Sequence, residues 1–320
     1  MIRGILPTDG QRHVYRCSPR ERVVSVAVSS PGHPPALLLD TFSLFFRAFF
    51  ALPPMSTSRG EATNALYGFS GLLLKLLREH PGAELCFALD TGPTFRHQEF
   101  QPYKAQRAVT PTPLVEQLRR LDELLERVGA VAIGSRGFEA DDVLATVAAE
   151  LRAEGRAALV VSGDRDLLQL AHGSVKVHFV GRRGKDALTY DEKLVRERFG
   201  VPPWRLPSYV ALVGDASDNL PSVPGIGPAT AKKLLENREN VGELLRDAPS
   251  LVPARTGQLL LDHAAQITHT EELARLRAVA PLPQPPHLAR PSQQSLSALR
   301  DWFEALEMKS LLLRLDKLRG

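Results

Sequence analysis

The strongest constraint on the fold is a repeated alternation of short apolar runs with helix-like stretches. Five such runs occur, ALLLD (36–40), ELCFALD (84–90), AVAIGS (130–135), AALVVSGD (157–164) and VKVHFV (175–180). Short, nearly continuous apolar runs are typical of strands buried on both faces. Helical periodicity fills intervals between them, at 63–80, 113–129 and 142–155. This order predicts an α/β fold whose mostly parallel central sheet is flanked by helices.

The pattern divides the 320 residues into unlike parts. We expect an α/β domain over residues 36–198 and an all-helical region over 199–320, because strands cease after about Phe199 and short helices follow. A Pro/Gln-rich linker at 281–295 leads to the last helix. Residues 1–35 carry scattered Arg, Pro and Gly without periodicity, and we interpret them as a disordered tail. A start codon assigned too far upstream would explain such a tail.

Composition says more about the cellular compartment of the protein than about its function. The formal net charge is +4 and the pI near 9.2, a mild excess that favours polyanions only weakly. Cys17 and Cys86 lie far apart in unlike contexts, so neither a disulfide framework nor a zinc site is expected. No apolar run reaches the roughly 18 residues of a membrane span. We therefore expect a protein of the reducing cytoplasm.

Carboxylates follow the predicted strands, and more occur in the helical region. Each alone has an ordinary explanation, as a helix cap, a first-turn acid or a turn residue. Their joint occurrence is harder to explain that way, because the carboxyl ends of parallel strands meet at one edge of a sheet. The nine acids are Asp40, Asp90, Glu139, Asp141, Asp142, Asp164, Asp166, Asp215 and Asp218.

So many like charges at one edge require either protonation or neutralising cations. Carboxylates without His or Cys partners suit Mg²⁺ or Mn²⁺, and two such ions are the known arrangement for displacement at phosphorus. Glu139 and Asp141 would point about 200° apart on a regular helix. They can share an ion only if Glu139 precedes the helix.

Basic residues interleaved with aromatics follow Asp90. Arg96, Tyr103, Lys104 and Arg107 suit phosphates and stacked bases, although a solvated surface loop is the alternative. Arg47 sits in the apolar stretch after Asp40. There it either extends to solvent or contacts a phosphate.

A second polyanion-binding candidate is the stretch PSVPGIGPATAKKLL, residues 221–235. Gly225 and Gly227 would let backbone N–H groups face a phosphate, with Lys232 and Lys233 on the following helix. A plain helix–helix turn with a solvated lysine pair is the alternative.

These motifs together resemble the 5′-nuclease family, which comprises flap endonucleases and the 5′→3′ exonuclease domain at the N-terminus of bacterial DNA polymerase I. The matching stretches are LLLDTFSLFFRAFFALP, FALDTGPTFRHQEFQPYKAQR, GFEADDVLAT, VVSGDRDLLQL and LVGDASDNLPSVPGIGPATAKKLL. The resemblance extends from about Ala36 to Leu313. No polymerase-like segment follows within the 320 residues, so we expect a free-standing nuclease.

The resemblance implies a PIN-like, resolvase-like α/β domain with a helical arch near 92–120 and a helix–three-turn–helix near 215–236. It implies a first metal set of Asp40, Asp90, Glu139 and Asp141 with Asp142 close by, and a second set of Asp164, Asp166, Asp215 and Asp218. Arg96, Tyr103, Lys104 and Arg107 match the arch that clamps the 5′ strand. The stretch 220–233, including Thr230, matches the duplex-gripping turn, which in the family often holds K⁺.

The family commonly has Asp-Ala-Lys where this chain has Asp90, Thr91 and Gly92, so a contact near the scissile phosphate is altered. The expected function is a Mg²⁺- or Mn²⁺-dependent, monomeric 5′→3′ exonuclease and flap endonuclease acting on DNA in replication and repair, with removal of RNA primers included. Two alternatives are a branched-DNA binding module that cuts weakly and an acid-cluster nuclease directed at RNA. The complete acid set and the helix–three-turn–helix favour the first reading.

Overall fold

The structure is a computed structural model that describes residues 34–181, 187–283, 285 and 287–319. The tail expected at residues 1–35 lies outside the described residues except for Pro34 and Pro35. In the described part of the chain, no helix is long and apolar enough to cross a membrane.

A six-stranded sheet forms the centre of the molecule, in the order β3-β2-β1-β4-β5-β6. The first five strands are parallel and match the five apolar runs, so the expected α/β class is confirmed. The sixth is an antiparallel edge strand that the sequence did not indicate, because three residues are too few to show a pattern. Their bounds are β1 Ala36–Asp40, β2 Leu85–Leu89, β3 Val131–Gly134, β4 Ala158–Ser162, β5 Val175–Phe179 and β6 Leu188–Tyr190.

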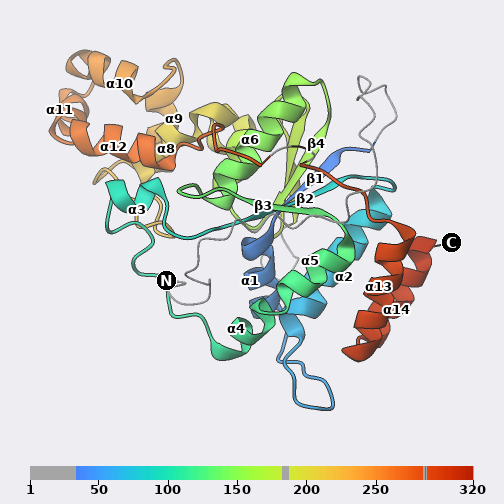
Figure 1. Cartoon of the computed structure of the whole chain (residues 1–320). Helices are drawn as coiled ribbons and strands as arrows, with labels where there is room; N and C mark the ends of the chain where they lie inside the picture. Colours follow the sequence, from blue (N-terminus) through green and yellow to red (C-terminus); the bar gives the residue numbers. More distant parts are fainter. Residues whose placement is uncertain (1–33, 182–186, 284, 286, 320) are drawn as a thin grey trace.

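Each face of the sheet has its own apolar core, because successive side chains of a strand point to opposite faces. Leu38 of β1 packs with residues of α6 (Ala140–Ala153), whereas Leu37 and Leu39 pack on the other side. That second core contains residues of six helices, which are labelled in Figure 1. They are α1 (Thr41–Ala51), α2 (Asn64–Glu79), α4 (Thr112–Leu118), α5 (Leu121–Val128), α13 (Gln293–Ala305) and α14 (Lys309–Arg319).

Two stretches expected as single helices are each broken. Residues 113–129 form two helices, α4 (Thr112–Leu118) and α5, separated by Arg119 and Arg120. The buried Gln117 at the end of α4 accepts the N–H groups of Ala65 and Leu66 at the start of α2. The last helix divides into α13 and α14 at Glu307, whose φ of 57° lies in the left-handed region. The expected arch, 92–120, contains the short α3 (Phe95–Glu99), turns and α4.

The helical region is divided in space. Its first part comprises the helices α8 (Leu206–Val213), α9 (Pro228–Leu235), α10 (Val241–Asp247), α11 (Ala254–Asp262) and α12 (Ala264–Ala274), at the upper left of Figure 1 and preceded by α7 (Glu192–Phe199). The chain then returns along the sheet, where Ala289 bridges to Leu85. Thus α13 and α14 pack on α5 and α2, away from the other helices of their expected region.

Candidate active site

Carboxylates from four separate segments end at one edge of the sheet. Asp40 is the last residue of β1, Asp90 follows β2, and Asp164 stands two residues after β4. Glu139 immediately precedes α6 in an extended conformation, with φ −85° and ψ 161°. The condition for Glu139 and Asp141 to face one site, that Glu139 lie outside the helix, is therefore met.

The pKa values of these carboxyl groups are raised both by burial and by the charges of the neighbouring acids. Burial raises the pKa of Asp40 to about 7, the Ser162 hydroxyl opposes the rise, and the charges of Asp164 and Asp90 add to it. Burial also raises the pKa of Asp141 well above its usual range, with Asp40 and Asp164 contributing. Acids separated by up to 124 residues of chain thus share one electrostatic environment.

A second group of acids adjoins the first. Asp166 begins a 3₁₀ turn after β4, and Asp215 and Asp218 lie in the loop after α8. Burial raises the pKa of Asp166 strongly, and the charges of Asp164, Asp218 and Asp215 raise it further. The loop from the helical region therefore completes a cluster of eight acids, and Asp142 points into a different set of contacts, described below.

Hydrogen bonds fix two of these carboxylates. The buried Ser162 hydroxyl donates to Asp40 and accepts the backbone N–H of Asp164 at 2.8 Å. Asp90 Oδ1 accepts the N–H of Ala140 at 2.8 Å, which ties the end of β2 to the first turn of α6. Ser162 was not among the expected site residues, although its place in VVSGD, at the end of the strand and two residues before Asp164, was a usable signal.

Lys104 lies among the acids. Its Nζ is 3.0 Å from Glu139 Oε1 and 3.4 Å from Asp218 Oδ2. Burial alone would lower the pKa of this ammonium, but the charges of Glu139 and Asp218 raise it, so Lys104 is held as a cation. Its φ of 53° is left-handed, which is uncommon for a residue other than glycine and often accompanies a functional position.

Tyr103 and Arg107 also turn toward the cluster. Tyr103 is buried, and its hydroxyl lies 2.7 Å from Asp218 Oδ2 and 3.0 Å from Glu139 Oε2. Stacking on a base, the role expected for Tyr103, is not possible for a ring this buried. Arg107 is half exposed and donates to Asp218 Oδ1 at 3.1 Å, so it can also reach a ligand.

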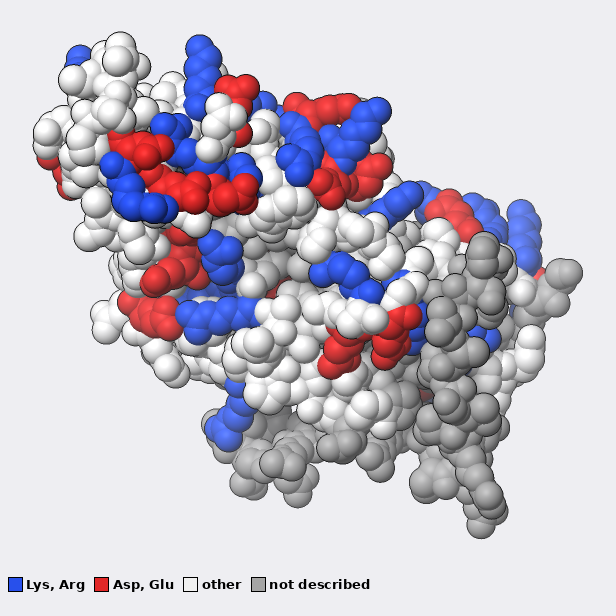
Figure 2. All heavy atoms as spheres, turned by 90° about the horizontal axis from the view of Figure 1, so that it is seen from above, with Lys and Arg blue, Asp and Glu red and all other residues white. Residues whose placement is uncertain are grey.

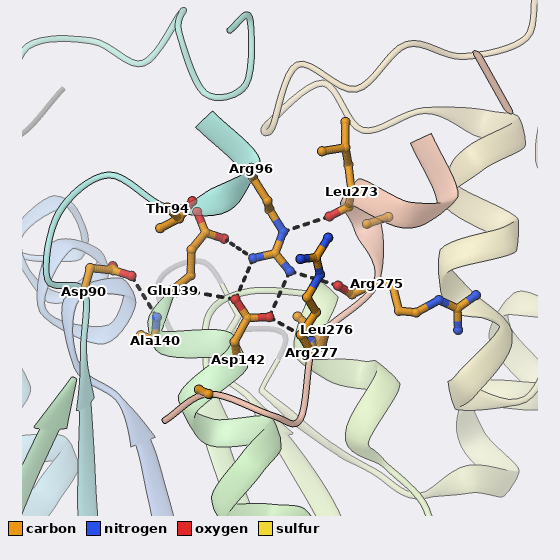
Figure 3. A network of polar contacts seen from close by, with 12 residues as sticks. Asp90, Thr94, Arg96, Glu139, Ala140, Asp142, Leu273, Arg275, Leu276 and Arg277 are labelled. Carbon is orange, nitrogen blue, oxygen red and sulfur yellow. Dashed lines mark hydrogen bonds and ion pairs between the residues drawn. The ribbon is translucent and has the colours of Figure 1, made fainter. Parts of the chain in front are cut away.

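Arg96 differs from its expected role as a phosphate clamp. Its side chain is only 2% exposed and forms a two-pronged ion pair with Asp142, which is fully buried. Neither residue faces solvent, because the pair is enclosed by α3, α6 and the chain leaving α12 (Figure 3).

The turn before α9, the second segment expected to contact DNA, is exposed at the surface. Gly225 has a φ of 81°, and both it and Gly227 at the start of α9 are exposed. Lys233 is exposed, whereas Lys232 Nζ donates to the Arg198 carbonyl. The remaining residue of this set, Thr230, is half-buried on α9.

Arg47 is anchored at the sheet edge. Its Nη2 donates to the Gly163 carbonyl at 2.6 Å, and its guanidinium lies 5.6 Å from the Phe179 ring centroid. This places Arg47 beside Asp164. Figure 2, seen from the side opposite α1 and α4, shows basic and acidic side chains intermixed, without one large basic patch on that face.

The donor chemistry of the cluster fits hard divalent cations. All of its candidate donor atoms are carboxylate oxygens, and burial together with repulsion between the acids raises the pKa of several of these groups. As the side chains stand, however, no three acids, histidines or cysteines of the described residues are arranged to hold an ion. Lys104 pairs with one acid of each group, Glu139 and Asp218.

The chain matches a family throughout most of its length. Residues 35–200 match the 5′-3′ exonuclease, N-terminal resolvase-like domain, and residues 201–295 match the 5′-3′ exonuclease, C-terminal SAM fold. DNA polymerase I of Mycobacterium tuberculosis is 38% identical over 286 residues, which is 88% of this chain and 31% of that protein. DNA polymerase I of Bacillus caldotenax is 39% identical over 247 residues, 77% of this chain and 28% of that protein.

The fold has a counterpart among solved structures. The bacteriophage T5 D15 flap endonuclease, in a complex with DNA and metal ions, aligns with a TM-score of 0.60 at 19% identity, covering 89% of this chain and all of that one. This likeness shows the fold. The chain spans about a third of the length of the polymerases it matches.

Proposed function

The chain belongs to the 5′-3′ exonuclease family, and from this premise we propose that it hydrolyses phosphodiesters of DNA at 5′ ends, flaps and nicks. The observation that carries the proposal is the gathering of eight carboxylates at one sheet edge beneath a basic segment. Buried acids with raised pKa values destabilise the folded protein, so stability does not explain the cluster. Acids with perturbed pKa values are found most often at functional sites.

The carboxylates divide into two sets that would hold Mg²⁺ or Mn²⁺. Asp40, Asp90, Glu139 and Asp141 form one, and Asp164, Asp166, Asp215 and Asp218 form the other. When bound, the ions supply positive charge and an activated water for phosphodiester hydrolysis. Asp142 is left out of both sets because its oxygens are engaged by Arg96.

The basic segment would bind and orient the 5′ strand. Lys104 and Arg107 already neutralise acids of the cluster, and both are long enough to exchange a carboxylate for a substrate phosphate. Tyr103 would hold Glu139 and Asp218 at a fixed separation through its hydroxyl. Arg47, fixed beside Asp164, would add a phosphate contact at the same edge.

Duplex DNA would bind at the exposed turn before α9. Backbone N–H groups near Gly225 and Gly227, the hydroxyl of Thr230 and the ammonium groups of Lys232 and Lys233 suit successive phosphates. The same turn is where we propose K⁺ binds. We further propose that the protein acts as a monomer, in the cytoplasm on the nucleoid. The T5 enzyme of the same fold has been solved with DNA and metal ions.

A labelled 5′-flap duplex incubated with Mg²⁺, Mn²⁺ or EDTA tests the proposal. Short 5′ products with either ion and none with EDTA are expected. Tight flap binding without cleavage under all conditions would instead indicate a branched-DNA binding module, which is favoured by one observation. Gly92 stands where the family commonly has a lysine and carries no cation, and the neighbouring Thr91 donates its hydroxyl to the Ser135 carbonyl. Preferential cutting of an RNA flap would support an RNA-directed nuclease.

A further inference from the structure

The Arg96 guanidinium uses every one of its N–H groups inside the protein (Figure 3). Nε donates to the Leu273 carbonyl at 2.8 Å. Nη1 donates to Asp142 Oδ2 at 2.7 Å and to Glu139 Oε2 at 3.3 Å. Nη2 donates to Asp142 Oδ1 at 3.0 Å and to the Arg275 carbonyl at 2.9 Å. A guanidinium carries five N–H donors, so none remains for a DNA phosphate.

The Asp142 carboxylate is equally saturated. Besides the two Arg96 contacts, Oδ1 accepts the backbone N–H of Arg277 at 2.8 Å, and Oδ2 accepts that of Glu139 at 3.2 Å. An ionised carboxylate offers about four acceptor positions, and all are filled here. Asp142 therefore has no oxygen lone pair directed at the acidic cluster, in contrast to Asp141 one residue earlier.

The pair joins three segments that are distant in sequence. Arg96 lies on α3, Asp142 on the first turn of α6, and the carbonyls and N–H group belong to residues 273–277, which we call the strap. The strap consists of the last two residues of α12 and the three residues that follow it.

Other contacts hold the strap on both sides. Gln169, in the 3₁₀ turn that begins at Asp166, donates to the Ala274 carbonyl and accepts the Leu276 N–H. The Arg277 guanidinium lies 3.5 Å from the Phe95 ring centroid and 3.3 Å from Glu99.

We propose that Arg96 and Asp142 form a positioning latch that sets Glu139 at the acidic edge by tying the start of α6 to α3 and the strap. The latch rests on the proposed function for its effect on hydrolysis. Glu139 is held twice, through its Oε2 by Arg96 and through its backbone N–H by Asp142. Movement of α3 or of the strap would therefore change the position of the Glu139 carboxylate in the cluster. Asp142 acts as an internal anchor and binds no ion.

The test compares Arg96→Met, Asp142→Leu and their double variant, with Asp141→Asn as the ion-binding reference. Arg300→Gln, in the exposed pair with Asp316 between α13 and α14, is the matched control for loss of an arginine charge. Four quantities are measured: the thermal midpoint, Mn²⁺ stoichiometry by electron paramagnetic resonance, flap affinity against salt in EDTA, and the separation of kcat from KM.

Each single variant is expected to lower the thermal midpoint, and the double variant to recover most of the loss, because it leaves no unpaired buried charge. The double variant should keep the wild-type Mn²⁺ stoichiometry and KM while kcat falls by about 100-fold, the scale for a group displaced by about 1 Å. Its salt slope of flap binding should equal that of wild type. If the pair had only a structural role, the double variant would recover kcat as well as the thermal midpoint.

Loss of an ion in Asp142→Leu equal to that in Asp141→Asn would overturn the latch, as would a salt slope reduced by about 0.9, which is the signature of one phosphate contact. Additive losses of the midpoint in the double variant would also reject it. Midpoint, stoichiometry and salt slope need no hydrolysis. If wild type binds flaps but does not cut them, the proposed function fails while the latch remains decidable.

Discussion

Two buried charge clusters adjoin each other at the start of α6, and they differ in balance. In the latch, Arg96 and Asp142 satisfy each other and the surrounding backbone, with every donor and acceptor used. In the acidic edge, burial raises the pKa values of Asp40, Asp141 and Asp166, and the charges of neighbouring acids raise them further. Two adjacent carboxylates of one motif therefore have opposite surroundings: Asp142 has a complete set of partners, whereas Asp141 faces other acids.

Asp141→Asn tests the unbalanced side most directly and should have the largest effect. Removing one carboxylate from the cluster is expected to lower flap cleavage by about 1,000-fold, the upper range for losing one electrostatic contact in an active site. Flap affinity in EDTA should persist. Single-turnover cleavage and fluorescence anisotropy measure the two quantities, with Glu154→Gln at the exposed end of α6 as control. Full cleavage by Asp141→Asn would reject the assigned site.

Asp142→Ala tests the balanced side through stability. The change removes both Asp142 contacts of the buried Arg96 and leaves Glu139, at 3.3 Å, as its remaining acidic partner, which should reduce the free energy of unfolding by about 3–5 kcal/mol. Urea denaturation measures it. Asp316→Ala, which breaks the exposed pair with Arg300, should cost less than about 1 kcal/mol. Equal losses in the two variants would mean that the buried pair is no more important than a surface pair.

The pH dependence of stability should report the excess charge. Asp40 has a folded pKa of about 7 against an ordinary 3.8, so its protonation stabilises the fold fully below about pH 4, and this contribution disappears as the pH rises through 7. In EDTA, Asp40→Asn should therefore gain about 2 kcal/mol relative to wild type between pH 4 and 8, since the coupled acids share the full shift.

Urea denaturation of both proteins at each pH gives this difference. A difference that stays constant with pH would show that Asp40 is not in a cluster with excess negative charge.

Lys104→Ala should have the smallest effect of the four variants, and it tests the cation that lies among the acids. Its ammonium contacts Glu139 and Asp218, and in the proposed complex it would contact the 5′ strand. Loss of one charge-assisted hydrogen bond should weaken flap binding by about 10-fold. Affinity for a duplex without a flap should change little, with the exposed Lys193→Ala as control. Equal weakening on both substrates would contradict the arch assignment.

Much of the framework was predictable. The five apolar runs became β1 to β5, and the helix expected over 142–155 is present as α6, which begins two residues earlier at Ala140 and leaves Glu139 extended outside it. The short β6, the break between α4 and α5 and the return of α13 and α14 to the sheet were not predictable, because each depends on contacts between distant segments.

The site divides along the same line. Local patterns identify the acids, since a strand end followed by a carboxylate is visible in a few residues. They cannot show that Tyr103 is buried, that Arg96 faces inward or that residues 273–277 cover Asp142, because those facts depend on which surfaces meet.

The strand–helix alternation and the acids at the strand ends follow from the sequence alone, since hydrophobic periodicity and parallel strand direction are local properties that the fold must obey. Packing between distant segments places Asp215 and Asp218 beside those acids, turns Asp141 toward them and gives Asp142 a complete set of partners. Adjacent residues on a helix point about 100° apart, and each side chain takes its role from the segment that packs against it.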